Sequence, residues 1–296
     1  MTDLRSPESN LASHASAEIP SRRPPFVAGE AKGVALALGG GFSRGFAHLG
    51  VLEVLEQERI PISAIVGTSI GGLLGAAYAD GISVRELCEL GRQVRVRDFL
   101  RYQTQAQGQR VEGQKRDRIS RFVYEYFQAR TVEELSIPTA IVTTDLDTGA
   151  AHVFTRGPLD VAIRASCAFP GLFKPVEYEG RRLADGCIVS PVPTVVAAQI
   201  NAACVLGIAV GSHEKSAPRE RRPLLQPSWA READVLLEPK VHHIDWNDFS
   251  RVDEIREAGA EAMRCALPQL RNLLDRQSQI HRATHVVAGM ESGAAL

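Results

Sequence analysis

Ser69 is the residue whose surroundings in the sequence most clearly predict chemistry. It lies at the centre of the pentapeptide Gly67-Thr-Ser-Ile-Gly71, after an apolar run and before a helical segment rich in small residues, 72–79. A serine on such a turn between strand and helix projects its hydroxyl above a sheet, where it can act as a nucleophile. Gly67 and Gly71 form the predicted elbow, because side chains there would clash with the strand or the helix.

A glycine cluster earlier in the chain is the second chemical element. The segment Gly39-Gly-Gly-Phe-Ser-Arg-Gly45 follows the apolar run 34–38 and precedes a helical pattern. Consecutive glycines let backbone N–H groups converge, and the following helix adds the positive end of its dipole. Such a loop can hold a phosphate or the oxyanion of an acyl-transfer intermediate.

The same order of strand, glycines and helix also begins a dinucleotide-binding unit. Here the glycine spacing is G-x-G-x-x-x-G, one residue longer than the usual fingerprint. The acidic residue expected at the end of the second strand is also missing, because that strand leads into Gly67-Thr-Ser69. Both departures disfavour a nucleotide site.

Asp185 is the third chemical element, within Leu183-Ala-Asp-Gly-Cys-Ile-Val189. An Asp-Gly pair commonly marks a turn. This pair precedes the apolar stretch that begins at Ile188, so its carboxylate can point inward. A solvated aspartate with a pKa of about 3.9 is a weak base, and accepting a serine proton therefore requires burial or few hydrogen bonds.

Taken together, these segments resemble the patatin-like phospholipase family, specifically its bacterial neuropathy-target-esterase-like branch. Weaker similarity extends to about residue 266. The resemblance is carried by the segments 34–50, 65–72, 143–149, 164–171 and 184–193.

The resemblance implies an enzyme that hydrolyses lipid carboxylic esters, such as phospholipids or lysophospholipids, without a metal or another cofactor. Ser69 matches the family nucleophile and Asp185 the base that accepts its proton. This dyad would form an acyl-enzyme that water then hydrolyses. The amides around Gly40, Gly41 and Phe42 match the oxyanion hole of the family.

Other positions of the motifs have supporting roles or depart from the family pattern. Gly45 and Gly186 are expected to support the loop or the substrate, and Arg44 either fills the family's basic position or braces the glycine loop. Cys187 stands where the family usually has Gly or Ala, and the stretch 211–232 is shorter than is usual. The sequence leaves open how these two features affect the site, which acyl chain or head group is preferred, and the oligomeric state.

Two alternatives remain at this point. The order Ser, Asp, His of an α/β-hydrolase triad could be completed by His213, His242 or His243, although an aspartate on a turn suits a dyad better. His48, on the first helix, is expected to pack or to form a hydrogen bond. The other alternative is a patatin-fold protein without turnover that binds lipid or regulates a partner.

Apolar runs alternate with helical patterns along the chain, which predicts a three-layer α/β sandwich with a mostly parallel central sheet. The last helix is expected to bend or break at Pro268. Strands are expected at 34–38, 62–66, 138–144, 151–155, 204–210 and 233–238, and helices at 46–58, at 72–79, in pieces over 84–129, and from 252 past 263.

Composition bounds the class of protein and its domains. The 296 residues are 44% hydrophobic with a net charge of −1, which favours one large hydrolase domain, 33–282, and gives no reason to expect nucleic acid as a partner. The polar segment 1–32 predicts a disordered tail, and 283–296 a loose one. The five cysteines are scattered, and the sequence shows neither a signal-peptide pattern nor an apolar run of about 18 residues. We therefore expect a cytoplasmic protein whose contact with a membrane is peripheral.

Residues 85–130 contain eleven Lys or Arg against six Asp or Glu, interleaved with aromatic residues. Such a run is usually a solvated helical face. The sharper interpretation is an interfacial patch that brings the mouth of the site to anionic lipid.

Overall fold

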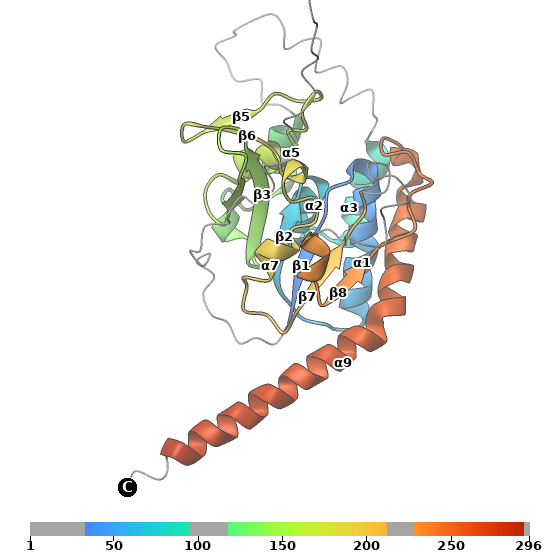
Figure 1. Ribbon diagram of the computed structural model, residues 1–296. Coiled ribbons are helices and arrows are strands. Elements are labelled where there is room, and N and C mark those ends of the chain that lie inside the picture. The colour runs from blue at the N-terminus through green and yellow to red at the C-terminus, as the bar shows by residue number, and fades with distance from the viewer. Residues whose placement is uncertain (1–32, 95–117, 212–227, 293–296) are drawn as a thin grey trace, which may run out of the picture.

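The structure is a computed structural model that describes residues 33–94, 118–211 and 228–292 (Figure 1). The predictions for the tail 1–32, for most of the loop 211–232 and for the middle of the basic region 85–130 lie outside the described residues.

An eight-stranded sheet forms the centre of the domain, in the order β5-β6-β3-β2-β1-β7-β8 with β4 paired to β3. Neighbouring strands among β1, β2, β3, β7 and β8 are parallel, whereas β4, β5 and β6 add antiparallel pairs at the β3 side. The strands are β1 Val34–Leu38, β2 Ile62–Thr68, β3 Thr139–Asp145, β4 Ala151–Phe154, β5 Val176–Tyr178, β6 Arg181–Asp185, β7 Cys204–Ile208 and β8 Val235–Leu237.

Strand β1 shows why the central strands are continuous apolar runs. Val34, Leu36 and Leu38 face the larger hydrophobic core, and Ala35 and Ala37 face a smaller core on the opposite side of the sheet. All five side chains are fully buried. A strand covered on both faces has no solvent side on which polar residues would alternate.

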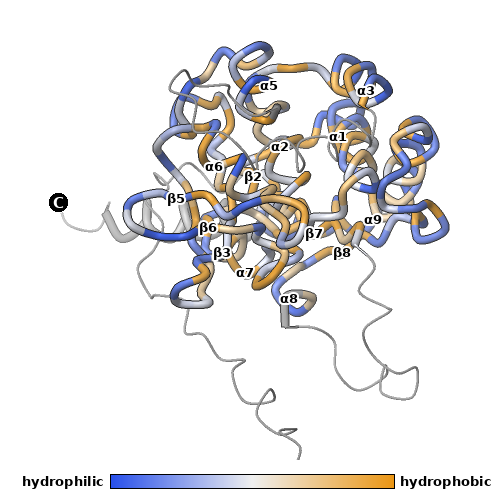
Figure 2. The backbone as a smooth tube through the Cα atoms, turned by 90° about the horizontal axis from the view of Figure 1, so that it is seen from above, coloured by the Kyte–Doolittle hydropathy of each residue, from blue (hydrophilic) through white to orange (hydrophobic). Residues whose placement is uncertain are grey.

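Helices cover both faces of this sheet, which confirms the predicted three-layer α/β sandwich (Figure 1). The larger core receives side chains from α1, α2, α6 and α9, and the smaller core from α7. Figure 2 shows hydrophobic residues concentrated at the central strands and hydrophilic residues at the periphery. The helices are η1 Phe42–Phe46, α1 Ala47–Gln57, α2 Ile70–Ala79, α3 Val84–Gln93, α5 Arg118–Tyr126, η2 Val132–Glu134, α6 Leu159–Ser166, η3 Gly186–Ile188, α7 Thr194–Ala197, α8 Ser228–Arg231, η5 Phe249–Arg251 and α9 Val252–Ser292.

The C-terminal helix α9 starts where the sequence predicted it and is not broken at Pro268. Helix α9 continues through Pro268 and ends at Ser292. Pro268 is exposed, so water can satisfy the carbonyl that loses its helical partner. Figure 1 shows α9 changing direction and projecting away from the sheet beyond the domain. Among the described residues, no helix combines the length and apolar character needed to cross a bilayer.

Helices α1 and α9 pack unusually closely, because each presents a glycine to the other. A Cβ atom at Gly50 would overlap the carbonyl oxygen of Arg256, and one at Gly259 would overlap the carbonyl oxygen of Ala47. This contact fixes α1, and with it the glycine loop that immediately precedes α1.

Replacing Gly259 with Ala should therefore lower the free energy of unfolding by about 1–3 kcal/mol, as other overpacking substitutions do. Urea denaturation measures the change, and Glu261→Ala is the control, because Glu261 is exposed on the same helix. If the two variants have the same free energy of unfolding, α1 and α9 can move apart to accommodate the added methyl group without loss of stability.

Candidate active site

Ser69 occupies a strained turn between β2 and α2. Its φ of 54° and ψ of −124° lie in a region that non-glycine residues rarely adopt. A Cβ atom at Gly67 would overlap Gly72, and one at Gly71 would overlap the carbonyl oxygen of Leu38. Both elbow glycines are thus required by close backbone approach. The surrounding chain holds the serine in a conformation that would cost about 1–3 kcal/mol in isolation.

The structure brings Ser69 and Asp185 together across strand β3. Val142 of β3 pairs with Thr68 at the end of β2, and the next residue, Thr143, pairs with Asp185 at the end of β6. The Ser69 hydroxyl donates a hydrogen bond to Asp185 Oδ2 at 2.7 Å. Residues 116 positions apart in the chain therefore form a buried hydroxyl–carboxylate pair.

Asp185 is 1% exposed, so its carboxylate is withdrawn from water. Its Oδ1 accepts a hydrogen bond from the Cys187 N–H at 2.8 Å, and Oδ2 accepts from Ser69. Burial raises the pKa of Asp185 above its ordinary value, and these hydrogen bonds offset only part of that effect. Burial therefore makes the carboxylate a stronger base than a solvated aspartate.

The end of helix α6 fixes both members of this pair, a contribution that the sequence did not reveal. Ser166 Oγ accepts a hydrogen bond from the Ser69 N–H at 2.8 Å and donates one to the Val142 carbonyl at 2.7 Å. Two residues further on, the Ala168 carbonyl accepts the Asp185 N–H at 3.0 Å. The only signal in the sequence was the segment 164–171, which contributes to the family resemblance.

The glycine loop lies directly against Ser69, with one correction to the predicted oxyanion hole. The Gly40 N–H donates to the Pro191 carbonyl at 3.0 Å, so this amide is already engaged and is removed from the predicted donors. Among the described residues, the amides of Gly41 and Phe42 form no hydrogen bond. A Cβ atom at Gly40 would lie 3.2 Å from Ser69 Cβ, which measures how closely the loop approaches the serine.

Two buried side chains brace the glycine loop. Arg44 donates from Nε to the Ile244 carbonyl at 2.8 Å and from Nη2 to the His242 carbonyl at 3.4 Å. His48 Nε2 donates to the Gly39 carbonyl at 2.7 Å. Burial lowers the pKa of His48 to about 4, so the ring is neutral near pH 7 and carries its proton on Nε2. Of the two predicted roles for Arg44, its contacts match bracing.

The remaining predicted positions pack tightly around the pair. A Cβ atom at Gly45 would overlap the Ile70 side chain, and one at Gly186 would overlap the Val142 carbonyl oxygen. The Cys187 thiol lies against Gly40, and burial raises its pKa well above the ordinary value. Cys187 therefore keeps a neutral thiol beside the carboxylate of Asp185.

The histidines of the triad alternative lie elsewhere or outside the described residues. His243 Nε2 contacts Glu254 at 2.9 Å, and the side chain of His242 is exposed. His213 lies outside the part of the chain that the structure describes. No hydrogen bond among the described residues joins a histidine to Ser69 or Asp185. The geometry thus favours a dyad.

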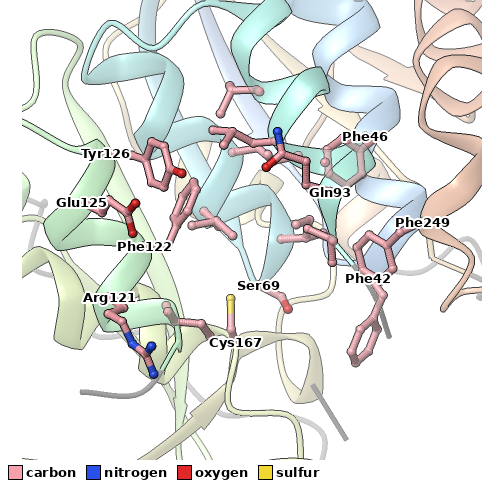
Figure 3. Close-up of a pocket in the computed structure, with 18 of the residues that line it drawn as sticks. Phe42, Phe46, Ser69, Gln93, Arg121, Phe122, Glu125, Tyr126, Cys167 and Phe249 are labelled. Atoms are coloured by element: carbon pink, nitrogen blue, oxygen red, sulfur yellow. The ribbon is translucent and has the colours of Figure 1, made fainter. Parts of the chain in front are cut away.

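A cavity of about 420 Å³ opens beside Ser69 (Figure 3). Helices α3 and α5, from the two ends of the basic region 85–130, form part of its wall, and Arg121 and Glu125 of α5 are its charged side chains. Its dimensions and lining suit a hydrocarbon chain. The apolar lining includes Phe42, Phe46, Ile70, Leu73, Leu74, Leu87, Leu90, Val94, Ile119, Phe122, Tyr126, Cys167, Phe173 and Phe249.

No group of three or more His, Cys, Asp or Glu side chains suited to a metal ion occurs within the described residues.

Comparison with known proteins identifies the class to which this fold and site belong. The family model described as "Patatin-like phospholipase" matches residues 36–198, more than half of the chain. The chain therefore belongs to the patatin-like phospholipase family, as the sequence motifs predicted.

Curated relatives agree with this assignment. An uncharacterized NTE family protein of Mycobacterium tuberculosis is 36% identical over 197 residues, which cover 66% of this chain and 54% of the relative. A lysophospholipase of Mycosarcoma maydis is 32% identical over 75% of this chain and 12% of its own length. The chain thus spans about half the length of its mycobacterial relatives, and far less of the fungal protein. Among solved structures, VipD from Legionella pneumophila is similar with a TM-score of 0.47 and 12% identity, over 84% of this chain and 68% of VipD.

Substituting Ser166 with Ala should destabilise the domain by about 1–3 kcal/mol, because the buried Ser69 N–H would lose its acceptor. Chemical denaturation gives the change in free energy. Ser190→Ala is the matched control, because the described hydrogen bonds of Ser190 are formed by its backbone. If the two variants unfold at the same denaturant concentration, Ser166 does not fix the turn.

Proposed function

We propose that this protein hydrolyses lipid carboxylic esters through a Ser69–Asp185 dyad. The observation that carries the proposal is the 2.7 Å hydrogen bond from Ser69 Oγ to a buried carboxylate, at the edge of an apolar cavity. Membership of the patatin-like phospholipase family supports a lipid ester hydrolase. The lysophospholipase among the relatives supports phospholipids or lysophospholipids as the substrate class.

In the proposed mechanism, the acyl chain enters the cavity and places the ester carbonyl over Ser69. Ser69 Oγ attacks the carbonyl carbon while its proton passes to Asp185 Oδ2. The amides of Gly41 and Phe42 donate to the oxyanion of the tetrahedral intermediate. The intermediate collapses to an acyl-enzyme, and the alcohol leaves with the proton from Asp185.

The second half of the reaction repeats these steps with water as the nucleophile. Asp185 accepts a proton from the water molecule that attacks the acyl carbonyl, and it returns this proton to Ser69 Oγ as the carboxylic acid is released. The neutral His48 has no place in these steps, because its proton is held by the Gly39 carbonyl.

We also propose a cytoplasmic location with peripheral contact to lipid through residues 85–130. Helices α3 and α5 of this region form part of the cavity wall. Tyr124 and Tyr126 of α5 are 37% and 41% exposed. Contact between α5 and a lipid surface would place the cavity next to its substrate.

A fluorophosphonate probe should label the wild-type protein at Ser69, and Ser69→Ala should abolish the labelling. Asp185→Asn should slow labelling by at least about 100-fold, because the amide cannot accept the serine proton. In-gel fluorescence measures the rate, and circular dichroism shows that each variant is folded. A folded wild-type protein that resists labelling would instead favour the lipid-binding or regulatory alternative.

The pH dependence of kcat/KM for a p-nitrophenyl ester should show an acid limb set by Asp185. Because burial raises the pKa of Asp185, the carboxylate protonates at a higher pH than ordinary aspartate, and activity falls as pH decreases through that value. His243→Ala should leave this limb in place. Loss of the limb in a histidine variant would contradict the dyad.

A further inference from the structure

A second cavity, of about 570 Å³, shares Phe42 with the lining of the cavity that contains Ser69. It adjoins the glycine loop, because Gly41 and Phe42 are part of its lining. Its other walls include Arg44, Phe169, Leu172 and Trp246. The proposed hydrolytic mechanism leaves this cavity without a role.

Phe42 is the one described residue that lines both cavities. Its φ of 52° places a non-glycine residue in the left-handed region, where a bulky side chain is rare. Its ring contacts Trp246 and Phe169 edge to face, with centroids 4.8 Å and 5.6 Å apart. The amide of the same residue is one of the two proposed oxyanion donors, so an ester held by this amide lies where the two cavities meet.

An ester bound at this point has two ends that must go in different directions. The acyl end stays attached to Ser69 until water releases it, and the apolar cavity beside Ser69 suits that end. The alcohol end must leave first, by a separate route. The second cavity adjoins the same amides, and its wall includes the half-exposed rings of Phe169 and Trp246, at 38% and 44% exposure.

We infer that the second cavity binds the alcohol side of the ester, an inference that rests on the proposed hydrolase function. The cavity selects alcohols that carry hydrocarbon next to the ester oxygen. Among the described residues of its lining, Arg44 is the one that carries a charge. The Arg44 side chain is buried and donates to the carbonyls of Ile244 and His242, so its charge braces the loop. The described part of this lining offers a charged head group no other counter-charge, whereas hydrocarbon would cover Phe169 and Trp246.

Trp246→Ala tests this inference, because the substitution removes the ring and keeps the backbone carbonyl that braces Ser43. That carbonyl accepts the Ser43 N–H at 3.0 Å and the Ser43 hydroxyl at 2.8 Å. Ile188→Ala is the matched control, since Ile188 is an apolar side chain with 49% exposure that lines neither cavity.

The experiment compares two pairs of substrates that share a decanoyl chain. Ethyl and 2-cyclohexylethyl decanoate differ in the apolar bulk of alcohols of similar acidity. 1-Decanoylglycerol and 1,2-didecanoylglycerol differ in a second acyl chain. For each pair, the ratio of kcat/KM for the bulkier ester to kcat/KM for the smaller one is measured in the wild type and in both variants.

We expect the wild type to prefer the bulkier ester in at least one pair, and Trp246→Ala to reduce that preference about tenfold or more. The pair that responds distinguishes a second acyl chain from another apolar alcohol. Ratios that are the same in the wild type, Trp246→Ala and Ile188→Ala would overturn the inference while leaving the hydrolase function intact. Failure to hydrolyse any of the four esters, together with failure to react with fluorophosphonate, would overturn the hydrolase function itself.

Discussion

A buried hydrogen bond between the side chains of Ser69 and Asp185 is the interaction that the surrounding elements of this domain hold in place. Forming it requires a serine held in a strained backbone conformation and a carboxylate withdrawn from water. Both conditions, the backbone strain and the burial of a carboxylate, cost free energy, so neither would persist without support from the surrounding structure. Both are met because β3 pairs with the strands that carry the two residues, and the end of α6 holds the backbone of each.

The surroundings of this pair separate the tasks that ester hydrolysis would require. The glycine loop is braced by Arg44 and His48. Within the described part of the chain the amides of Gly41 and Phe42 have no hydrogen-bond partner, so they can face developing negative charge. The cavity beside Ser69 is mostly apolar, and Phe42 lines both this cavity and a second one. Phe42, whose backbone has a positive φ, therefore has two proposed roles. Its amide stabilises the oxyanion, and its side chain lies where the acyl end and the alcohol end of the ester would enter different cavities.

Local sequence was sufficient for the features that depend on neighbouring residues. The apolar runs of β1 and β2 and the glycines around Ser69 predicted the central strands and the elbow, because a buried strand and a tight turn constrain their own residues. Features that depend on distant partners were missed. The short elements α6, α7 and the β5–β6 hairpin have weak hydrophobic patterns in the sequence. The role of Ser166 depends on a hydrogen bond to Ser69, 97 residues away in the chain. The Gly40 amide is engaged by the carbonyl of Pro191, which is also distant in the sequence. Of the two outcomes predicted at Pro268, a bend or a break, the structure excludes the break, because the helix continues through this exposed residue.

The most direct test of the account is to look for the acyl-enzyme itself. The protein is mixed with excess p-nitrophenyl decanoate, quenched in acid within milliseconds, digested and examined by peptide mass spectrometry. We expect a decanoyl group on the peptide that contains Ser69, formed in step with the burst of nitrophenol. Turnover without any adduct, or with the acyl group on another residue, would contradict it.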